Sequence, residues 1–331
     1  VYMTLANNDY SMAYDLVPDD MIGSNFWQMA YEQAIQVYGQ YSLVPDYGSL
    51  FTMQEENSVE SIFELQISQS ASNSQMGRNF TPNNYKDGQS FGWLTVNANI
   101  YDDHSATYPG DLRLEGEFLE NQVCGGSAPP RKGATYISYY WNNNSNSNGY
   151  APNGIRPSNG TCANFGVRVY PKRTRTRYAN AHPYFFKYAT KDVTSSNQYD
   201  DKNIIIYRYA DLLLMLAEIS NELQNGQQLG YVTEVLDRSG LNSLGYSGLS
   251  QSDFTDKIMK EYRYELIGEG EDAHNNRRRG YDYFMNNVIL PHNNNPSLNF
   301  ASMDLTLSED SDQVMFLPLP VREINTNELI D

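Results

Sequence analysis

Residues 207–218 read YRYADLLLMLAE, and this stretch decides the fold. The six consecutive residues 212–217 are apolar, so a helix over 209–223 is hydrophobic nearly all round its middle. A helix of that kind lies in the interior of a protein. Gly226 follows three residues later and favours its termination. The stretch therefore predicts a deeply buried central helix.

Helical patterns continue on both sides of this stretch. Residues 229–238 are the next predicted helix, and a third follows that Ser252 or Asp253 caps. The apolar stripe of the third helix comprises Phe254, Ile258, Met259, Tyr262 and Leu266. Upstream, Asn25 caps a helix whose apolar positions recur to residue 37. Two helical hairpins within residues 1–40 suggest an α-solenoid or a helical bundle.

The middle of the chain has a different character. Residues 59–68 alternate as a strand, but residues 70–203 are rich in Asn, Gly, Ser, Pro and Tyr. Their best short strands are 135–141 and 183–188, and residues 314–320 near the C-terminus are predicted to be extended. A long irregular stretch inside a compact protein is usually functional loop structure. We predict a mostly α-helical protein with a large irregular insert that contains short strands.

Composition excludes some classes of partner. The 331 residues include 40 acidic and 23 basic side chains, for a formal charge of -17. Nucleic-acid binding and docking on an anionic membrane both need clustered cations, so neither is expected. Aromatic residues are 13% of the chain, with 27 Tyr, and Asn often occurs in runs. Such a chain offers amide hydrogen bonds and flat aromatic faces to a ligand.

Two cysteines, Cys124 and Cys162, bracket a segment rich in Gly, Pro, Asn and Ser. A disulfide between them would close this loop and contribute about 3–4 kcal/mol in the loop-entropy model. The alternative is two unpaired thiols. We expect the disulfide, which favours a location outside the cytoplasm. The chain opens VYMTL, without a signal-peptide pattern, so we expect its start to be processed or truncated.

Motifs of catalysis and metal binding are missing from the sequence. It contains no GxGxxG, GxxxxGK[ST], GxSxG or HExxH, and its four histidines are isolated. Asp102, Asp103 and His104 are interpreted as a solvated loop or a helix cap. A glycosidase needs only two opposed carboxylates, and no pair stands out among the 40 acidic residues. We therefore expect no catalytic residues, no metal site and no cofactor.

Two basic clusters stand against the acidic background. The first contains Arg173, Arg175 and Arg177, and the second is Arg277–Arg279. Loop charges that balance nearby acids explain such clusters in most proteins. The sharper hypothesis is that Arg173, Arg175 and Arg177 contact an acidic partner.

Aromatic residues of the irregular region are the best ligand signal. A sugar ring stacks its apolar face on Trp or Tyr, while its hydroxyls bind amides and carboxylates. The candidate ligand residues are Trp93, Tyr101, Asp102, Tyr139, Tyr140 and Trp141, and the wider aromatic groups also include Phe91, Tyr108 and Tyr136. The alternative is that Trp93 anchors a core, because large aromatic side chains are mostly buried.

The chain resembles the SusD/RagB family of outer-membrane nutrient-binding lipoproteins of Bacteroidota. Similar stretches occur in order along nearly the whole chain: YSL and LF (41–43, 50–51), ESIFE (60–64), YPGDLR (108–113), YRYADLLLMLAE (207–218), VLDRSGL (235–241), EYRYELIGEG (261–270) and LPLPVREINTN (317–327). The family normally follows the last helix of this set with "RW.DL.RW", whereas here residues 271–284 differ.

The resemblance implies a single domain over 1–331 that lacks the N-terminal part of the family and its lipid anchor. Its scaffold would be tetratricopeptide-like, with residues 1–40 as the last helical repeat units, 70–203 as the region for ligand and partner, and 204–331 as the C-terminal helical core.

In function, the resemblance implies a non-enzymatic protein on the outer face of the outer membrane. It would act as the lid of a SusC-like TonB-dependent barrel transporter and capture oligosaccharides for nutrient uptake. Two alternatives stay open: a peptide-binding member of the same family, and a structural or accessory subunit of a larger outer-membrane complex.

Overall fold

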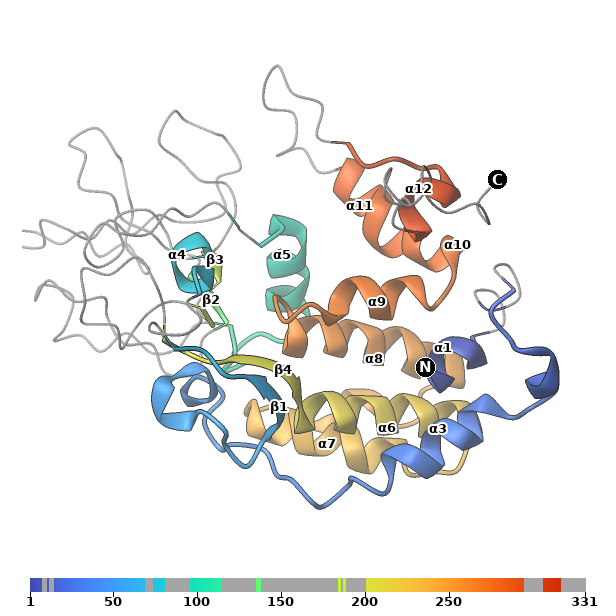
Figure 1. The fold of residues 1–331 in the computed structure, drawn as a ribbon, viewed down its shortest axis with the longest axis horizontal. Helices are drawn as coiled ribbons and strands as arrows, with labels where there is room; N and C mark the ends of the chain where they lie inside the picture. Colours follow the sequence, from blue (N-terminus) through green and yellow to red (C-terminus); the bar gives the residue numbers. More distant parts are fainter. Residues whose placement is uncertain are drawn as a thin grey trace, which may run out of the picture.

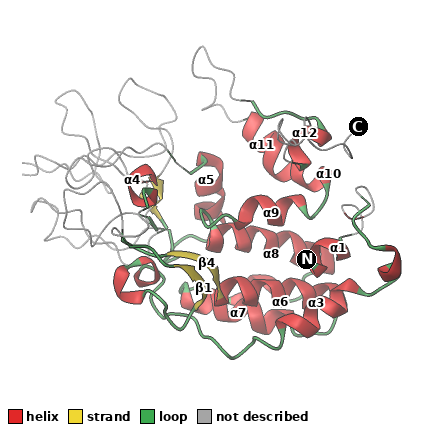
Figure 2. Ribbon diagram, viewed as in Figure 1, coloured by secondary structure: helices red, strands yellow, loops and turns green. Residues whose placement is uncertain are grey.

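A computed structural model gives the fold and describes residues 1–7, 11, 15–68, 74–80, 94, 96–114, 135–137, 184–185, 187–188, 201–294 and 306–316. Helices dominate these residues, which confirms the predicted fold class (Figures 1 and 2). The helices are α1 (Tyr2–Ala6), α3 (Phe26–Ala34), α4 (Met76–Phe80), α5 (Ala98–Thr107), α6 (Tyr209–Leu223), α7 (Gln228–Arg238), α8 (Gln251–Leu266), α9 (Glu271–Arg277), α10 (Tyr281–Phe284), α11 (Leu290–Asn293) and α12 (Ser311–Met315). Short 3-10 turns cover Asp19–Met21, Ser49–Phe51, Met53–Glu55 and Ser243–Tyr246, and a π-helical turn covers Met285–Ile289.

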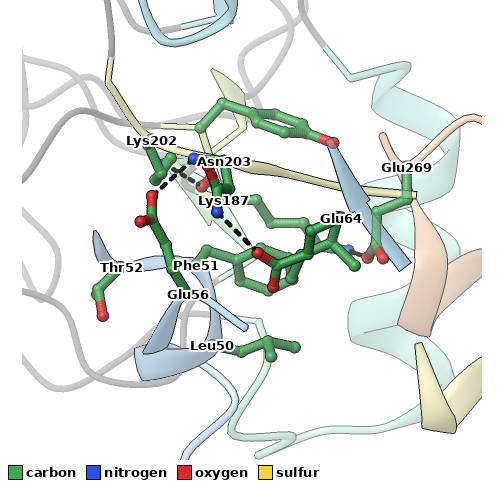
Figure 3. Close-up of a pocket in the computed structure, with 11 residues that line it drawn as sticks. Leu50, Phe51, Thr52, Glu56, Glu64, Lys187, Lys202, Asn203 and Glu269 are labelled. Carbon is green, nitrogen blue, oxygen red and sulfur yellow. Dashed lines mark hydrogen bonds and ion pairs between the residues drawn. The ribbon is translucent and has the colours of Figure 1, made fainter. Parts of the chain in front are cut away.

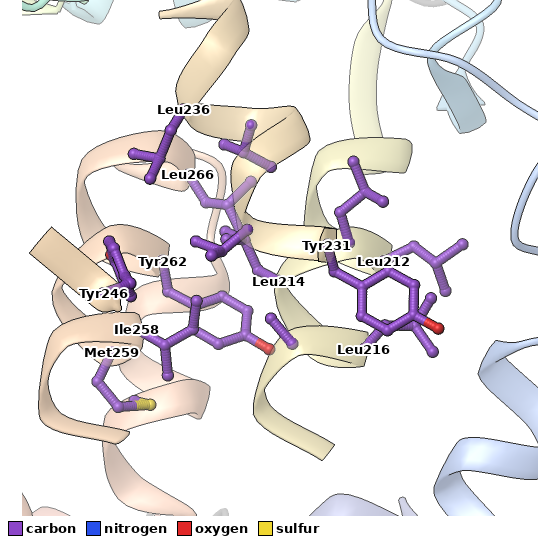
Figure 4. Close-up of a cluster of buried hydrophobic side chains, with 14 of the residues drawn as sticks. Leu212, Leu214, Leu216, Tyr231, Leu236, Tyr246, Ile258, Met259, Tyr262 and Leu266 are labelled. Atoms are coloured by element: carbon purple, nitrogen blue, oxygen red, sulfur yellow. The ribbon is translucent and has the colours of Figure 1, made fainter. Parts of the chain in front are cut away.

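Helix α6 lies at the centre of the helical part, with α3, α7 and α8 packed against it (Figure 1). Its observed bounds match the predicted range 209–223. Leu212, Leu214 and Leu216 of α6 meet Tyr231 of α7 and Ile258 of α8 in one hydrophobic cluster (Figure 4). Burying an aliphatic side chain of this size contributes roughly 2 kcal/mol. This cluster is therefore the main stabilising core of the helical part.

Capping residues set where two of these helices begin. The side chain of Asn25 accepts a hydrogen bond from the backbone N–H of Gln28, 3.1 Å away, as predicted for α3. Helix α8 begins two or three residues earlier than predicted. Ser250, not Ser252 or Asp253, is its cap, because the Ser250 hydroxyl accepts from the Asp253 N–H at 3.1 Å and donates to the Asp253 carboxylate at 2.7 Å.

The N-terminal helices extend the core on one side of α6. Met3 of α1, Ala30 of α3 and Ile219 of α6 form a small second cluster. Trp27 and Tyr31 of α3 pack against it while half-buried. Helix α3 thus packs on α6 and α1 packs on α3, and the membership of residues 1–40 in a helical repeat stays a prediction.

A two-stranded antiparallel ribbon leads into α6. Strand β1 (Ser61–Leu65) pairs with β4 (Ile204–Arg208), and β4 continues directly into the helix (Figure 1). Glu64 and Ile205 are paired residues of this ribbon. On β1, Phe63 and Leu65 are exposed, and Glu64 between them is buried. The predicted strand at 59–68 is therefore confirmed, in a shorter form.

The described parts of the insert contain helices that the sequence did not predict. Helices α4 and α5 lie beside a second small ribbon, made of β2 (Tyr136–Ile137) and β3 (Tyr184–Phe185) (Figure 1). The two short strands fall inside the predicted ranges 135–141 and 183–188. Val96, Leu114 and Tyr136 join Phe185, Tyr188 and Ile267 in a cluster separate from the main core. This part of the insert therefore has a core of its own.

The C-terminal part, from α9 to α12, forms another layer next to α8 (Figure 1). Phe284, Ile289, Val314 and Met315 form its cluster. The prediction of an extended segment over 314–320 is wrong at its start. Val314 and Met315 end helix α12, whose N–H at Asp312 is capped by the Asp310 side chain at 3.0 Å. Residues 317–331 lie outside the described residues.

The second basic cluster, Arg277–Arg279, fastens this C-terminal layer to α6. Arg278 makes two hydrogen bonds to the Glu218 carboxylate, at 2.6 and 2.5 Å, and both side chains are buried. Arg277 donates to the backbone carbonyl of Val314 at 2.6 Å. The cluster balances internal acids and carbonyls, so it is structural.

Candidate functional site

Four buried side chains join the β1–β4 ribbon to the ends of α7 and α8. The Arg208 guanidinium bonds Glu60 Oε1 at 2.8 Å and Glu265 Oε1 at 2.6 Å. Arg238 bonds Glu60 at 2.8 Å and also contacts Glu265. Burial alone would raise the pKa of Glu265, but Arg238, Arg208 and Arg113 hold it well below its usual range. Glu265 is therefore an ionised acid at the centre of a buried charge network.

Arg113 brings the irregular insert into the same network. Its Nη1 lies 2.5 Å from Glu261 Oε1 and 2.8 Å from Glu265 Oε2, both on α8. Its Nε and Nη2 bond Asp111, with a shortest distance of 2.7 Å. The Arg113 side chain is fully buried. A guanidinium whose three nitrogens all bond carboxylates fixes both the position and the orientation of the turn that carries it.

A buried histidine supports this turn from behind. His104 of α5 has one ring nitrogen 2.9 Å from Asp111 Oδ2 and the other 2.9 Å from the Tyr136 hydroxyl. The ring also stacks on Tyr264 of α8 at 4.2 Å. Burial lowers the pKa of His104, although Asp111 opposes it. Burial would raise the pKa of Asp111, but Arg113 and His104 lower it to about 2.

Lys187 is the second cation that the insert contributes. Its ammonium donates to the backbone carbonyl of Glu265 at 2.8 Å and to Glu269 Oε1 at 2.6 Å. It also lies 5.3 Å from the ring centroid of Tyr47 and 5.1 Å from that of Phe51. Burial lowers its pKa to about 8, with Glu269 opposing the shift. Lys187 thus holds the turn after β3 against the end of α8.

A small hollow opens beside Lys187 (Figure 3). Glu56, Glu64, Lys202, Asn203 and Glu269 are among the residues that line it. Its volume is ≈ 20 Å³, which is enough for about one water molecule. The lining groups already bond one another, as when the Asn203 side chain donates to Glu64 at 3.1 Å. This hollow is too small for a sugar ring or a peptide side chain.

Two of the predicted ligand residues lie in the described structure, side by side on helix α5. The Tyr101 ring meets the Tyr136 ring edge-on at 5.2 Å and is half-buried. Asp102 is half-buried next to it. The other ligand candidates, the predicted partner contacts and the predicted disulfide lie outside the described residues; these are Trp93, Tyr139, Tyr140, Trp141, Arg173, Arg175, Arg177, Cys124 and Cys162.

Several aromatic residues of the insert serve packing. Tyr136 is fully buried, and Tyr188 is buried with its hydroxyl donating to the Gly268 carbonyl at 2.6 Å. Tyr108 packs against the main core, and its hydroxyl lies 3.2 Å from the Tyr246 hydroxyl. The interpretation of residues 102–104 as a solvated loop or a helix cap is wrong, because they lie in the interior of α5, whose caps are Asn97 and Tyr108, and His104 is buried.

Sequence reasoning missed the charge network, although every member of its centre lies in a quoted motif. Glu261 and Glu265 are one turn apart on the same side of α8 as the buried Ile258 and Tyr262. Acidic side chains on the buried side of a helix need cations in the protein interior, so this spacing could have predicted buried ion pairs. The spacing could not identify the cations, because Arg113 is 148 residues from Glu261 in the sequence.

Within the described ranges, no three His, Cys, Asp or Glu side chains are placed to hold a metal ion. No helix there is long and apolar enough to cross a membrane.

Known proteins resemble the chain in both sequence and fold. SusD-like protein P25 of Formosa agariphila is 28% identical over 152 residues, which are 45% of this chain and 27% of that protein. A SusD homolog of Bacteroides thetaiotaomicron superimposes with a TM-score of 0.58 at 17% identity, covering 86% of this chain and 52% of that one. Surface glycan-binding protein A of the same organism gives 0.50 at 20% identity, covering 78% and 51%.

The chain spans about half the length of these solved relatives. The family model itself, described as the SusD family, matches residues 59–331. That range holds both strands of the β1–β4 ribbon, the central helix α6 and the whole buried charge network. The chain belongs to the SusD family.

Proposed function

We propose that the protein is a non-enzymatic, cell-surface substrate-binding protein that captures oligosaccharides and acts as the lid of a SusC-like TonB-dependent transporter. The match of the SusD family to residues 59–331 is the observation that carries this proposal. A solved protein of similar fold is described as a surface glycan-binding protein, which supports a glycan as the ligand class. The protein would lie on the outer face of the outer membrane, held by a lipid anchor N-terminal to this chain.

The chemistry of the chain also favours a glycan. Aromatic residues make up 13% of it, and Asn runs are frequent. Of the described candidates, Tyr101 is half-buried, and its ring meets the Tyr136 ring edge-on. Aromatic rings held in this way present a rigid, flat surface at low entropic cost. Trp93, Tyr139, Tyr140 and Trp141 are proposed to complete the stacking surface, with Asp102 accepting hydroxyl hydrogens.

Binding in this proposal takes place on an open surface. The hollow beside Lys187 has room for about one water, so it offers no enclosed sugar pocket. Open sites draw their affinity from several stacking contacts along a chain, each of modest strength. We therefore expect oligosaccharides of several units to bind more tightly than the monosaccharide.

Titration calorimetry with a panel of oligosaccharides and a matched panel of peptides tests the ligand class. We expect Trp141→Ala to weaken glycan affinity by about tenfold, the loss typical of a stacking aromatic. Trp27→Ala is the control, because Trp27 lies half-buried on α3 in the helical part.

Equal affinities of the two tryptophan variants would remove Trp141 from the site. Binding of peptides alone would replace the glycan by a peptide ligand. Release of sugar products above background would contradict the non-enzymatic proposal. If the lipidated full-length protein purifies without a barrel transporter, the proposed role as a transporter lid is contradicted.

A further inference from the structure

Without the side chains of the insert, the buried charge network contains more acidic than basic groups. The ribbon and the end of α8 contribute four carboxylates, and β4 and α7 contribute two guanidiniums. The carboxylates are Glu60, Glu261, Glu265 and Glu269, and the guanidiniums belong to Arg208 and Arg238. All are buried or nearly so. Buried carboxylates in excess of cations are costly, so this surface of the core requires further cations.

The insert supplies two cations to that surface, from two places far apart in the sequence. Arg113 bonds Glu261 and Glu265, and Lys187 bonds Glu269 and the carbonyl of Glu265. Both cations are buried, with at most 1% of the residue exposed. The contacts fall along one side of α8 and its C-terminal end. Two charged contacts at separate points prevent the insert from rotating about either one.

The two contact points belong to one folded unit. The Thr135 N–H donates to the Arg113 carbonyl, and Tyr136 next to it pairs with Phe185 in the β2–β3 ribbon. Lys187 follows this ribbon by two residues. Helix α5 joins the unit through the hydrogen bond between His104 and the Tyr136 hydroxyl. Lys187 is therefore connected through β3 and β2 to α5, which also contacts α8 directly where the Tyr264 hydroxyl donates to Asp103 at 2.6 Å.

We propose that Arg113 and Lys187 are positioning residues, which clamp the insert onto α8 and so fix the orientation in which α5 presents Tyr101 and Asp102 to the ligand. This inference rests on the proposed function for its last clause only. The clamp itself is a property of the protein without ligand. Neither residue touches the ligand, because both side chains are buried.

Lys187→Met tests the clamp with little loss of volume. Its matched control is Lys257→Met, since Lys257 also donates to a backbone carbonyl, that of Gly245 at 2.6 Å, and also lies over a ring, that of Tyr246. Hydrogen exchange of the whole chain is compared between variants. We expect exchange in α5 to rise by about tenfold in Lys187→Met and to stay unchanged in α6 and α7, because opening becomes local. Lys187→Arg, which keeps the charge, should restore most of the protection.

Exchange in α5 that equals the wild type in Lys187→Met, or that rises equally in α6 and α7, would overturn the clamp. A glycan that binds the wild type should bind Lys187→Met about tenfold more weakly and Lys187→Arg nearly normally, a pattern a purely global effect would not produce. Unchanged affinity despite raised exchange would overturn the positioning of Tyr101 and Asp102. Failure of the wild type to bind any glycan would contradict the proposed function. The hydrogen-exchange result would still decide whether the clamp exists, because it needs no ligand.

Discussion

The Arg278–Glu218 pair illustrates how much a single buried residue contributes to the stability of this protein. Its two charge-assisted bonds connect the layer from α9 to α12 with the central helix. Removing Arg278 leaves the buried Glu218 carboxylate with the longer contact to Arg279, at 3.4 Å, and breaking a buried pair in this way costs about 3–5 kcal/mol. We expect Arg278→Met to lower the free energy of unfolding by that amount in urea titrations. Arg263→Met, which breaks a partly exposed pair with Asp272, should cost about 1 kcal/mol or less.

The double variant Arg278→Met/Glu218→Met separates the pair from simple packing. Replacing both charged partners by apolar side chains is often close to neutral. The double variant should therefore be more stable than Arg278→Met alone. If both unfold at the same urea concentration, the ion pair is not the source of the loss.

Asp111 predicts a specific dependence of stability on acid. Its pKa is about 2 in the folded chain, below the ordinary value of 3.8, because Arg113 and His104 outweigh the effect of burial. A lowered pKa stabilises the fold above the unfolded value, and this contribution, about 2 kcal/mol, is lost as pH falls from about 4 to about 2. The stability gap between wild type and Asp111→Asn should be constant from pH 7 to about pH 4 and shrink below it.

Unfolding titrations at a series of pH values measure this gap. Asp237→Asn is a suitable control, because Asp237 is an exposed side chain of α7. A gap for Asp111→Asn that stays constant down to the acid limit would show that Asp111 is not the titrating group.

At the scale of elements, Gly268 is the contact point between the end of α8 and β3. Its φ is +84°, and a Cβ there would lie 2.6 Å from the Phe185 ring. Gly248 has a similar φ of +73° with nothing within 4 Å of its Cβ position. Alanine at either site lowers stability by about 1–2 kcal/mol through backbone strain. Only Gly268→Ala also crowds a neighbouring side chain, which lowers stability by about 1–3 kcal/mol more.

We therefore expect Gly268→Ala to lower the melting temperature more than Gly248→Ala does, and to raise hydrogen exchange around residues 184–188. Equal shifts for the two variants would mean that the ring of Phe185 moves aside without cost.

Elements with strong local signals could be predicted from the sequence. The continuous apolar run made the bounds of α6 readable, and Asn25 marked the start of α3. Ser250 was missed because Ser252 and Asp253, two and three residues later, are equally good caps by type alone. Helix α5 was missed because its apolar pattern is weak and its buried face is polar: His104 is held by Asp111 and Tyr136, 7 and 32 residues away.

On the scale of the whole molecule, the family motifs turn out to be parts of one structure. Stretches separated by up to 205 residues in the sequence contribute Glu60, Arg113, Arg208, Arg238 and Glu265 to a single buried network. Sequence could identify the motifs but not their convergence, because no local pattern encodes a long-range ion pair. Of the candidate ligand surface, only Tyr101 and Asp102 lie in the described structure, so the rest stays a prediction.

The buried ion pairs leave the acidic balance of the chain unchanged. Among the described residues, Arg113, Arg208 and Arg278 are buried in pairs with acidic side chains. Each pair removes one acidic and one basic charge together, so the formal charge of the whole chain stays at -17. A net negative charge repels anionic polymers and leaves neutral, hydroxyl-rich ones as the better ligands.

Retention in native gels tests this account most directly. The chain is run through gels that contain neutral polysaccharides, acidic polysaccharides or none, beside Trp141→Ala and Trp27→Ala. The account predicts that a neutral polysaccharide slows the wild type and Trp27→Ala, and slows Trp141→Ala much less. Equal mobility of all three proteins in every gel, together with heat stability that no oligosaccharide shifts, would contradict it.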